Sequence, residues 1–212
     1  MHAIRAMLLC ALAIAFAPAA RAAGGCDGMT PKEYETWRDY QAAIKDPVVL
    51  KMKEAKRKPA IAKNFKISLK ELEAALKKGD AQGADLPKKC EESSKEGVAG
   101  TPLTERVLSL SVDPSTSEHV VTYVSWRARK PAELEEEASL LAFRLARASP
   151  LSKTIAMWAE DDQGKKVFEA KILSERALNF KEDRISEFAD SRYIRLFEDV
   201  KNSYAAEASG GN

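Results

Sequence analysis

One stretch, residues 106–173, constrains the fold most strongly, because its apolar residues change from the two-residue period of a strand to a helical period and back. Alternating runs at Arg106–Val112 and His119–Arg127 predict two strands, and Pro131–Ala148 has the spacing of an amphipathic helix. Two more strand-like runs, Thr154–Glu160 and Lys165–Leu173, are joined by Asp-Asp-Gln-Gly, a typical hairpin turn. We therefore predict a ββαββ unit with a two-layer core.

A further apolar series follows this unit at helical spacing and predicts a C-terminal helical segment. Its members are Ile185, Phe188, Ala189, Tyr193, Leu196, Phe197 and Val200. The whole pattern, ββαββα over residues 105–203, predicts an α+β domain. In it, helices cover one face of a four-stranded antiparallel or mixed sheet. Residues 204–212 are expected to form a disordered tail.

Residues 1–22 have the pattern of an export signal. His2 and Arg5 precede an apolar run from Ala6 to Ala17, and small residues follow where a signal peptidase would cut. The run is too short to cross a bilayer, and no later segment approaches the roughly 18 apolar residues of a transmembrane helix. We expect an exported protein, periplasmic or secreted, with no transmembrane segment after processing. Loss of residues 1–22 leaves 32 basic and 32 acidic residues, so the net charge is zero and indicates neither an acidic nor a basic partner.

The cysteines support the same compartment. Cys10 would leave with the signal, so Cys26 and Cys90 remain, and an even number of cysteines in an oxidising compartment predicts a disulfide between them. The alternative is a lipid anchor at Cys26, which follows Ala-Gly-Gly.

Capping signals predict a small helical domain over residues 27–78. Thr30-Pro31 with Glu33 begins one helix, Asp46-Pro47 begins a second, and Ser68 with Glu71 begins another. Tyr34, Trp37 and Tyr40 are expected to be its core, with ligand stacking as the alternative; Gly79 stands where a helix C-cap belongs. Residues 79–104 are rich in Gly, Ser, Pro and charge, and predict a linker.

Part of this domain, residues 60–76, resembles the helix-turn-helix of DNA-binding repressors. Its apolar and capping residues stand where that motif has its packing residues: Ile61, Ala62, Phe65, Ile67, Ser68, Leu72 and Leu76. The resemblance implies nucleic-acid binding through this segment. Lys66 replaces the usual turn glycine, however, and Glu71 and Glu73 on the second helix would meet phosphates with the wrong charge. A structural role for these helices is therefore the main interpretation. Nucleic-acid binding ranks third among the functions, after the binding module and the hydrolase described below.

The densest local charge predicts a second kind of site. Seven cations stand with one acid, Glu54, in a short segment: Lys51, Lys53, Lys56, Arg57, Lys58, Lys63 and Lys66. This run predicts contact with a polyanion, such as an acidic envelope polymer, an anionic lipid headgroup or a negatively charged partner protein; the alternative is a solvated helix face. Arg127, Arg129 and Lys130, just before a helix N-terminus, are a second candidate anion site.

The sequence offers little for catalysis. His119 is the only histidine beyond residue 22, and we find no glycine-rich phosphate loop and no CxxC pair, so we predict no catalytic residue, cofactor or metal. We predict an exported, non-catalytic binding or assembly module of the cell envelope. The alternative is a hydrolase that uses carboxylates, for which Asp161 and Asp162 are one available pair.

Overall fold

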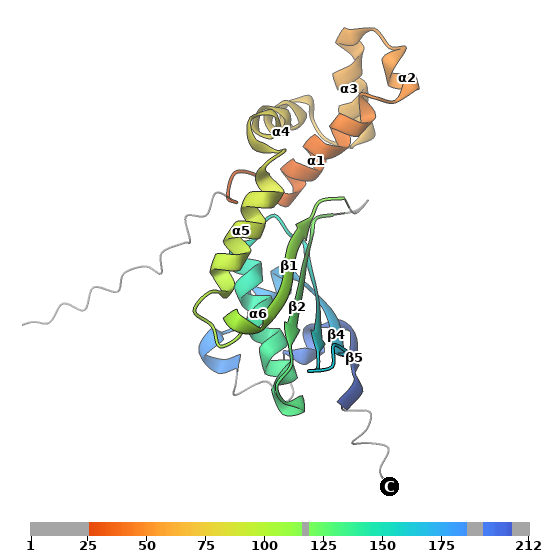
Figure 1. The fold of residues 1–212 in the computed structure, drawn as a ribbon. Coiled ribbons are helices and arrows are strands. Elements are labelled where there is room, and N and C mark those ends of the chain that lie inside the picture. Colours follow the sequence, from red (N-terminus) through yellow and green to blue (C-terminus); the bar gives the residue numbers. More distant parts are fainter. Residues whose placement is uncertain (1–25, 116–118, 186–192, 205–212) are drawn as a thin grey trace, which may run out of the picture.

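The computed structural model describes residues 26–115, 119–185 and 193–204. Helices α1 to α4 form one end of an elongated molecule, and a sheet backed by helices forms the other (Figure 1). The predicted signal, residues 1–22, and residues 205–212 of the predicted tail lie outside the described residues. The helices are α1 Pro31–Ala43, α2 Pro47–Leu50, α3 Glu54–Asn64, α4 Leu69–Gln82, α5 Leu86–Val98, α6 Leu134–Ala148 and α7 Ser174–Ala177. None of the helices in the described part is long and apolar enough to cross a membrane.

The sheet has five strands in the order β1-β2-β3-β4-β5: Val107–Asp113, Val121–Arg127, Thr154–Glu160, Lys166–Leu173 and Glu198–Asn202. β2 and β3 are parallel, and the other neighbours are antiparallel. The α+β class and a mixed sheet are confirmed, but the predicted four strands are wrong. The fifth strand, β5, pairs with β4 in a segment where a helix was predicted. Four of the five residues of β5 are exposed, so the sequence has no apolar alternation there that would indicate a strand. Residues 186–192 of that predicted helix lie outside the described residues.

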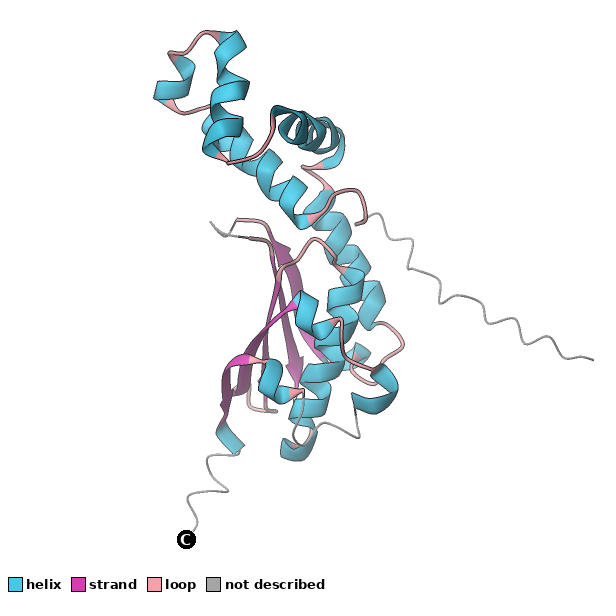
Figure 2. Ribbon diagram, turned by 180° about the vertical axis from the view of Figure 1, so that it is seen from behind, coloured by secondary structure: helices cyan, strands magenta, loops and turns pink. Residues whose placement is uncertain are grey.

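The main core lies between α6 and one face of the sheet. Leu110, Val124, Met157 and Ala170 are cross-strand neighbours in one row of that face. α6 contributes Leu134, Leu141 and Leu145, all with at most 1% of their surface exposed. Burying such side chains stabilises a fold by about 1.5–3 kcal/mol each. Figure 2 shows the helices gathered on this side of the sheet.

The helical end begins its elements where the sequence predicts. Thr30 and Glu33 form a capping box at α1, Asp46 accepts from the Val48 N–H at α2, and Ser68 and Glu71 form a capping box at α4. α4 continues past Gly79 to Gln82, so the predicted C-cap at Gly79 is wrong. Gly79 is buried beneath the Trp37 ring, which lies so close that a Cβ there would fall 2.1 Å from Trp37 Cγ.

Residues 79–104, predicted as a linker, hold the end of α4 and all of α5. The buried side of α5 includes Leu86, Cys90, Ser94 and Val98, and its middle residues are too small and polar to show an apolar period. The helix takes part in two buried clusters. Val98, at its C-terminal end, belongs to the main core. Leu86 and Cys90 belong to a second cluster, whose other members are Cys26, Met29, Tyr34, Val112, Val120 and Leu151. The second cluster contains residues of both ends of the molecule. Whether the two ends fold independently stays a prediction.

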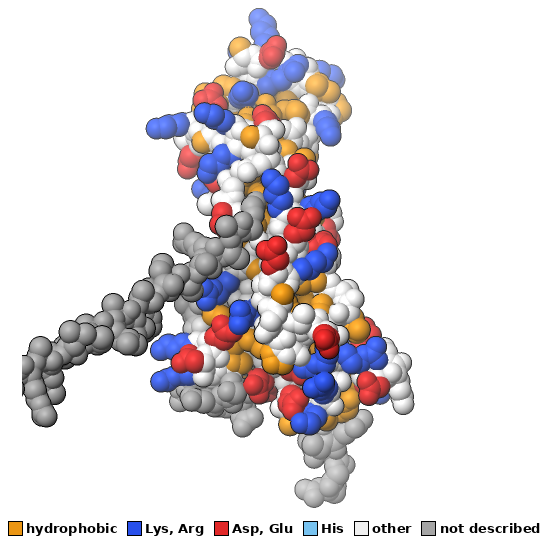
Figure 3. Space-filling model, turned by 60° about the vertical axis from the view of Figure 1, so that its left-hand side comes forward, with side chains coloured by type: hydrophobic (Ala, Val, Ile, Leu, Met, Phe, Trp, Pro, Cys, Tyr) orange, Lys and Arg blue, Asp and Glu red, His pale blue; other side chains and the backbone are white. Residues whose placement is uncertain are grey.

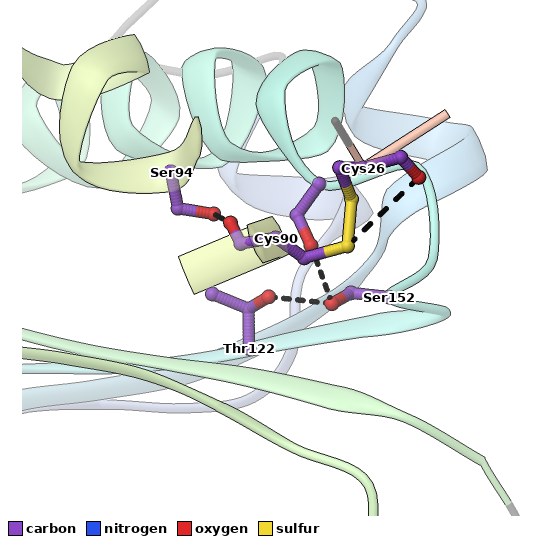
Figure 4. Close-up of a disulfide and its surroundings, with 6 residues drawn as sticks. Cys26, Cys90, Ser94, Thr122 and Ser152 are labelled. Atoms are coloured by element: carbon purple, nitrogen blue, oxygen red, sulfur yellow. Dashed lines mark hydrogen bonds between the residues drawn. A yellow bond between two sulfur atoms is a disulfide. The ribbon is translucent and has the colours of Figure 1, made fainter. Parts of the chain in front are cut away.

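The predicted disulfide joins Cys26 to Cys90, with their Cα atoms 4.7 Å apart (Figure 4). Both cysteines are buried, and the Ser94 hydroxyl donates to the Cys90 carbonyl oxygen at 2.7 Å. Beside them the hydroxyls of Thr122 and Ser152 are hydrogen-bonded at 2.6 Å. The bond ties the start of the described chain to α5, and a Cys26 sulfur in this bond is not available for a lipid.

Candidate functional site

The strongest candidate site is the basic surface, which we define as Lys51, Lys53, Lys56, Arg57, Lys58, Lys63 and Lys66. It runs from the end of α2 along α3 to the turn before α4. All six lysines are exposed, and none of them pairs with a carboxylate within residues 26–115, 119–185 and 193–204. Figure 3 shows basic side chains spread over this end of the molecule. The surface therefore offers several positive charges that are not paired with any carboxylate of the described residues.

The amphipathic pattern of α3 directs some of these charges outward. Ile61 and Ala62 are buried on the inner side of the helix. Lys56 and Lys63 are seven residues apart, close to two turns, so they share a side, and at 100° per residue that side lies opposite Ile61 and Ala62. Lys53 stands at the N-cap of the same helix. These three lysines are thus held by one rigid element.

Arg57 differs from the lysines around it. Its guanidinium donates from Nη2 to the Leu50 carbonyl oxygen at 2.9 Å and from Nε to the Met52 carbonyl oxygen at 3.1 Å. Half-buried, it holds the turn between α2 and α3; its charge remains, but its Nε and Nη2 donors are already used. Arg57 is therefore a positioning residue, and the basic surface presents six lysines to a ligand.

The turn between α3 and α4 lies in the segment that resembles a helix-turn-helix. Lys66 adopts a φ of 56°, a conformation that favours glycine. At the start of α4, Glu71 accepts hydrogen bonds from the backbone and hydroxyl of Ser68, and these bonds lower the pKa of the Glu71 carboxyl. An ionised Glu71 and an exposed Glu73 therefore flank the helix end that would have to approach phosphates.

The second candidate anion site does not bring its three cations together. Arg127 is half-buried and donates to the Asp161 carbonyl oxygen at 2.9 Å. Lys130 pairs with Glu133 at 2.7 Å, and its hydrogen bond is the main reason why the pKa of Glu133 is lowered. Of these three cations, only Arg129 is exposed and has no ion pair with any of the described residues. We draw no function from this group.

Sequence reasoning missed a buried polar group in the sheet domain. The Glu137 carboxylate pairs with Arg106 and accepts a hydrogen bond from Trp126 Nε1 at 2.8 Å; only 7% of its side chain is exposed. Glu137 is one of several acids in the first turn of α6, where the helix dipole alone favours acidic residues and gives no sign that one of them is buried. Its position three residues after the buried Leu134, on the inner side of the helix, was the available signal.

Asp161, one of the two acids available to a hydrolase, binds backbone groups, and the capping residue Glu33 binds a lysine. Asp161 accepts hydrogen bonds at 2.9 Å from the backbone N–H groups of Gln163 and Lys165 and so closes the predicted hairpin. Glu33 pairs with Lys78 at 2.7 Å, and this hydrogen bond is the largest cause of the lowered pKa of its carboxyl. A general acid needs the opposite shift.

Two hollows lie on the described surface at the helical end. They measure about 200 and 220 Å³, below the roughly 300 Å³ at which ligand pockets begin. Both lie at the start of α1 and are lined by Thr30 and Glu33, the capping pair of that helix. His119 lies elsewhere, hydrogen-bonded through Nε2 to the Thr154 hydroxyl at 2.9 Å. No group of three or more potential metal ligands occurs among the residues that the structure describes.

No family model, no curated protein and no solved structure matches this chain. The charges and contacts of the chain itself are therefore what indicate its function.

Proposed function

We propose that the protein is an exported, non-catalytic binding or assembly module of the cell envelope that holds a polyanion on its basic surface. The observation that carries the proposal is the set of six exposed lysines that find no carboxylate partner in the described part of the chain. Unneutralised charges of one sign attract a ligand of the opposite sign and speed its association. A ligand with many negative groups would supply the missing partners.

The form of the surface favours an extended ligand over a small anion. The lysines are distributed along α3 and the turns at both of its ends, and they do not converge on one of the two small hollows. A chain of phosphates or carboxylates can neutralise several of them at once, and each contact releases counterions. Affinity should then depend on the number of contacts made and on salt.

Two features support the envelope as the location. The disulfide between Cys26 and Cys90 suits an oxidising compartment, where such bonds persist. The apolar run and small residues within positions 1–22 have the pattern of an export signal. The protein would meet the acidic polymers and anionic surfaces of that compartment.

The test compares two triple variants of equal net charge. K53Q/K56Q/K63Q removes three lysines of the basic surface and leaves Arg57 in place, so the turn that it holds is kept. The control, K77Q/K88Q/K89Q, removes three exposed lysines of α4 and α5. Both should fold normally, because exposed substitutions usually change stability by no more than about 0.5 kcal/mol; thermal melts check this.

Binding of fluorescent inorganic polyphosphate is then measured at low salt. Exposed ion pairs contribute about 0.2–1 kcal/mol each, so losing three should weaken binding roughly tenfold, while the control stays within about twofold of the parent. Equal loss in both variants would mean that net charge alone acts and that the basic surface is only a solvated face. Double-stranded DNA serves as a second probe, and a clear preference for it would favour the helix-turn-helix interpretation.

A further inference from the structure

The far end of the molecule carries exposed aliphatic side chains. Helix α2 buries none of its residues; Val48 is 66% exposed and Leu50 is 51% exposed. These are the two most exposed of the large hydrophobic side chains in the described residues. We call α2 with its flanking residues, positions 45–58, the tip. In Figure 1 the tip lies at the end of the molecule opposite the sheet.

Cations surround these aliphatic side chains. The tip contains six basic residues and two acids, Asp46 and Glu54. Lys45, Lys51 and Lys53 lie within three positions of α2 in sequence, and all are exposed. One of the two acids, Asp46, is used as the N-cap of α2, where it accepts from the Val48 N–H at 2.7 Å. Figure 3 shows hydrophobic and basic side chains side by side at this end.

The tip is built to keep this arrangement. Asp46 and Pro47 fix the start of α2, and the Leu50 N–H donates to the Asp46 carbonyl oxygen at 2.9 Å. Arg57 binds the carbonyl oxygens of Leu50 and Met52 from the other side. With its backbone held at both ends, α2 keeps Val48 and Leu50 in water.

We propose that the tip docks on an anionic phospholipid bilayer, with Val48 and Leu50 entering the interface and the lysines contacting headgroups. This inference rests on the proposed function, since it names the anionic partner of the same surface. A hydrophilic polymer can pair with the lysines, but it has no apolar phase in which Val48 and Leu50 could be buried. A bilayer supplies both negative charge and an apolar phase just beneath it, which is how interfacial elements bind without spanning.

The test separates the apolar contribution from the charge contribution. V48S/L50S removes the aliphatic side chains and keeps every lysine, and K51Q/K53Q does the reverse. The controls are L178S, because Leu178 is 50% exposed at the sheet end of the molecule, and K88Q/K89Q on α5. All proteins are produced by the same route and share one N-terminus, so whatever precedes residue 26 contributes equally. Thermal melts confirm that each variant folds.

Binding is measured by cosedimentation with vesicles of phosphatidylcholine alone and of phosphatidylcholine with about one third phosphatidylglycerol. The parent should prefer the anionic vesicles. K51Q/K53Q should weaken that binding about 25-fold, at roughly fivefold per lysine near an anionic leaflet. V48S/L50S should weaken it at least about tenfold, from the lost apolar burial. The two controls should bind like the parent.

Polyphosphate in solution provides the decisive comparison. V48S/L50S should bind polyphosphate like the parent, because that ligand has no apolar phase. If V48S/L50S keeps full vesicle binding while the parent binds polyphosphate, the membrane inference is wrong and a soluble polymer is the ligand. If the parent binds neither anionic vesicles nor polyphosphate, the proposed function fails together with the inference.

Discussion

Replacing Gly79 by alanine tests how α1 packs on α4. Gly79 lies inside α4, and an added Cβ would come 2.1 Å from both Cγ and Cδ1 of Trp37. These atoms belong to the base of a rigid ring, so the side chain cannot simply swing its far end away. The indole is also held in place by a hydrogen bond of 3.1 Å from Trp37 Nε1 to Asp80.

Two opposing effects set the magnitude. Overpacking of a closed contact costs about 1–3 kcal/mol, and the short distances at Gly79 place this substitution near the upper value. Alanine in a helix interior is favoured over glycine by about 1 kcal/mol. We therefore expect G79A to lower the free energy of unfolding by about 2 kcal/mol. In a W37A background the ring and its Cγ are both gone, and the same change should raise the free energy of unfolding by about 1 kcal/mol.

Urea unfolding of the parent, G79A, W37A and the double variant measures both effects. The expected reversal of sign corresponds to a coupling of about 3 kcal/mol between the two positions. A helix C-cap with positive φ at Gly79 would instead make alanine destabilising in both backgrounds. Stabilisation by G79A in the parent, or an equal loss in both backgrounds, would refute the packing described for α1 and α4.

Three further outcomes follow from the contacts. The disulfide closes a loop of 64 residue positions, so its reduction should lower the free energy of unfolding by about 4 kcal/mol in urea. Reduction should also raise the intact mass by two hydrogen atoms. An unchanged mass would mean that the two cysteines are not joined. E137Q leaves Arg106 without its buried carboxylate and should cost about 3 kcal/mol in urea unfolding; less than about 1 kcal/mol would mean that the pair is solvated. Glu33 and Glu71 have lowered pKa values, so the stability they contribute is present above pH 4.5 and lost as pH falls through those values. Thermal melts of E33Q/E71Q should accordingly vary less with pH below 4.5 than melts of the parent.

Local chemistry made much of the fold predictable. The pairs Thr30 with Glu33 and Ser68 with Glu71 mark helix starts through bonds within four residues, and the structure begins α1 and α4 there. The first four strands also lie where apolar alternation places them, because one side of each faces α6. Such signals depend only on neighbours in sequence.

The errors arose where tertiary contacts decide the structure. α5 packs through small and polar residues such as Cys90 and Ser94, whose burial is visible only once α6 and β1 are in place. β5 is held by backbone pairing with β4, and its exposed side chains carry no pattern. Trp37 explains Gly79 only through the contact between α1 and α4.

The candidate site divides in the same way. Its lysines were evident as a run of charge, and the structure exposes all six. The sequence could not show that Arg57 binds the backbone of the preceding turn, or that Val48 and Leu50 remain exposed beside the lysines. The seven cations of the run are therefore not equivalent: six are exposed lysines, and Arg57 holds a turn.

The salt dependence of polyanion binding tests the central claim most directly. Affinity for polyphosphate is measured between about 50 and 200 mM salt for the parent and for K53Q/K56Q/K63Q. Plotted as logarithms, affinity should fall linearly with salt. The slope of the variant should be shallower by about two to three, near one for each lysine contact removed. Equal slopes for the two proteins would show that the basic surface does not hold the ligand.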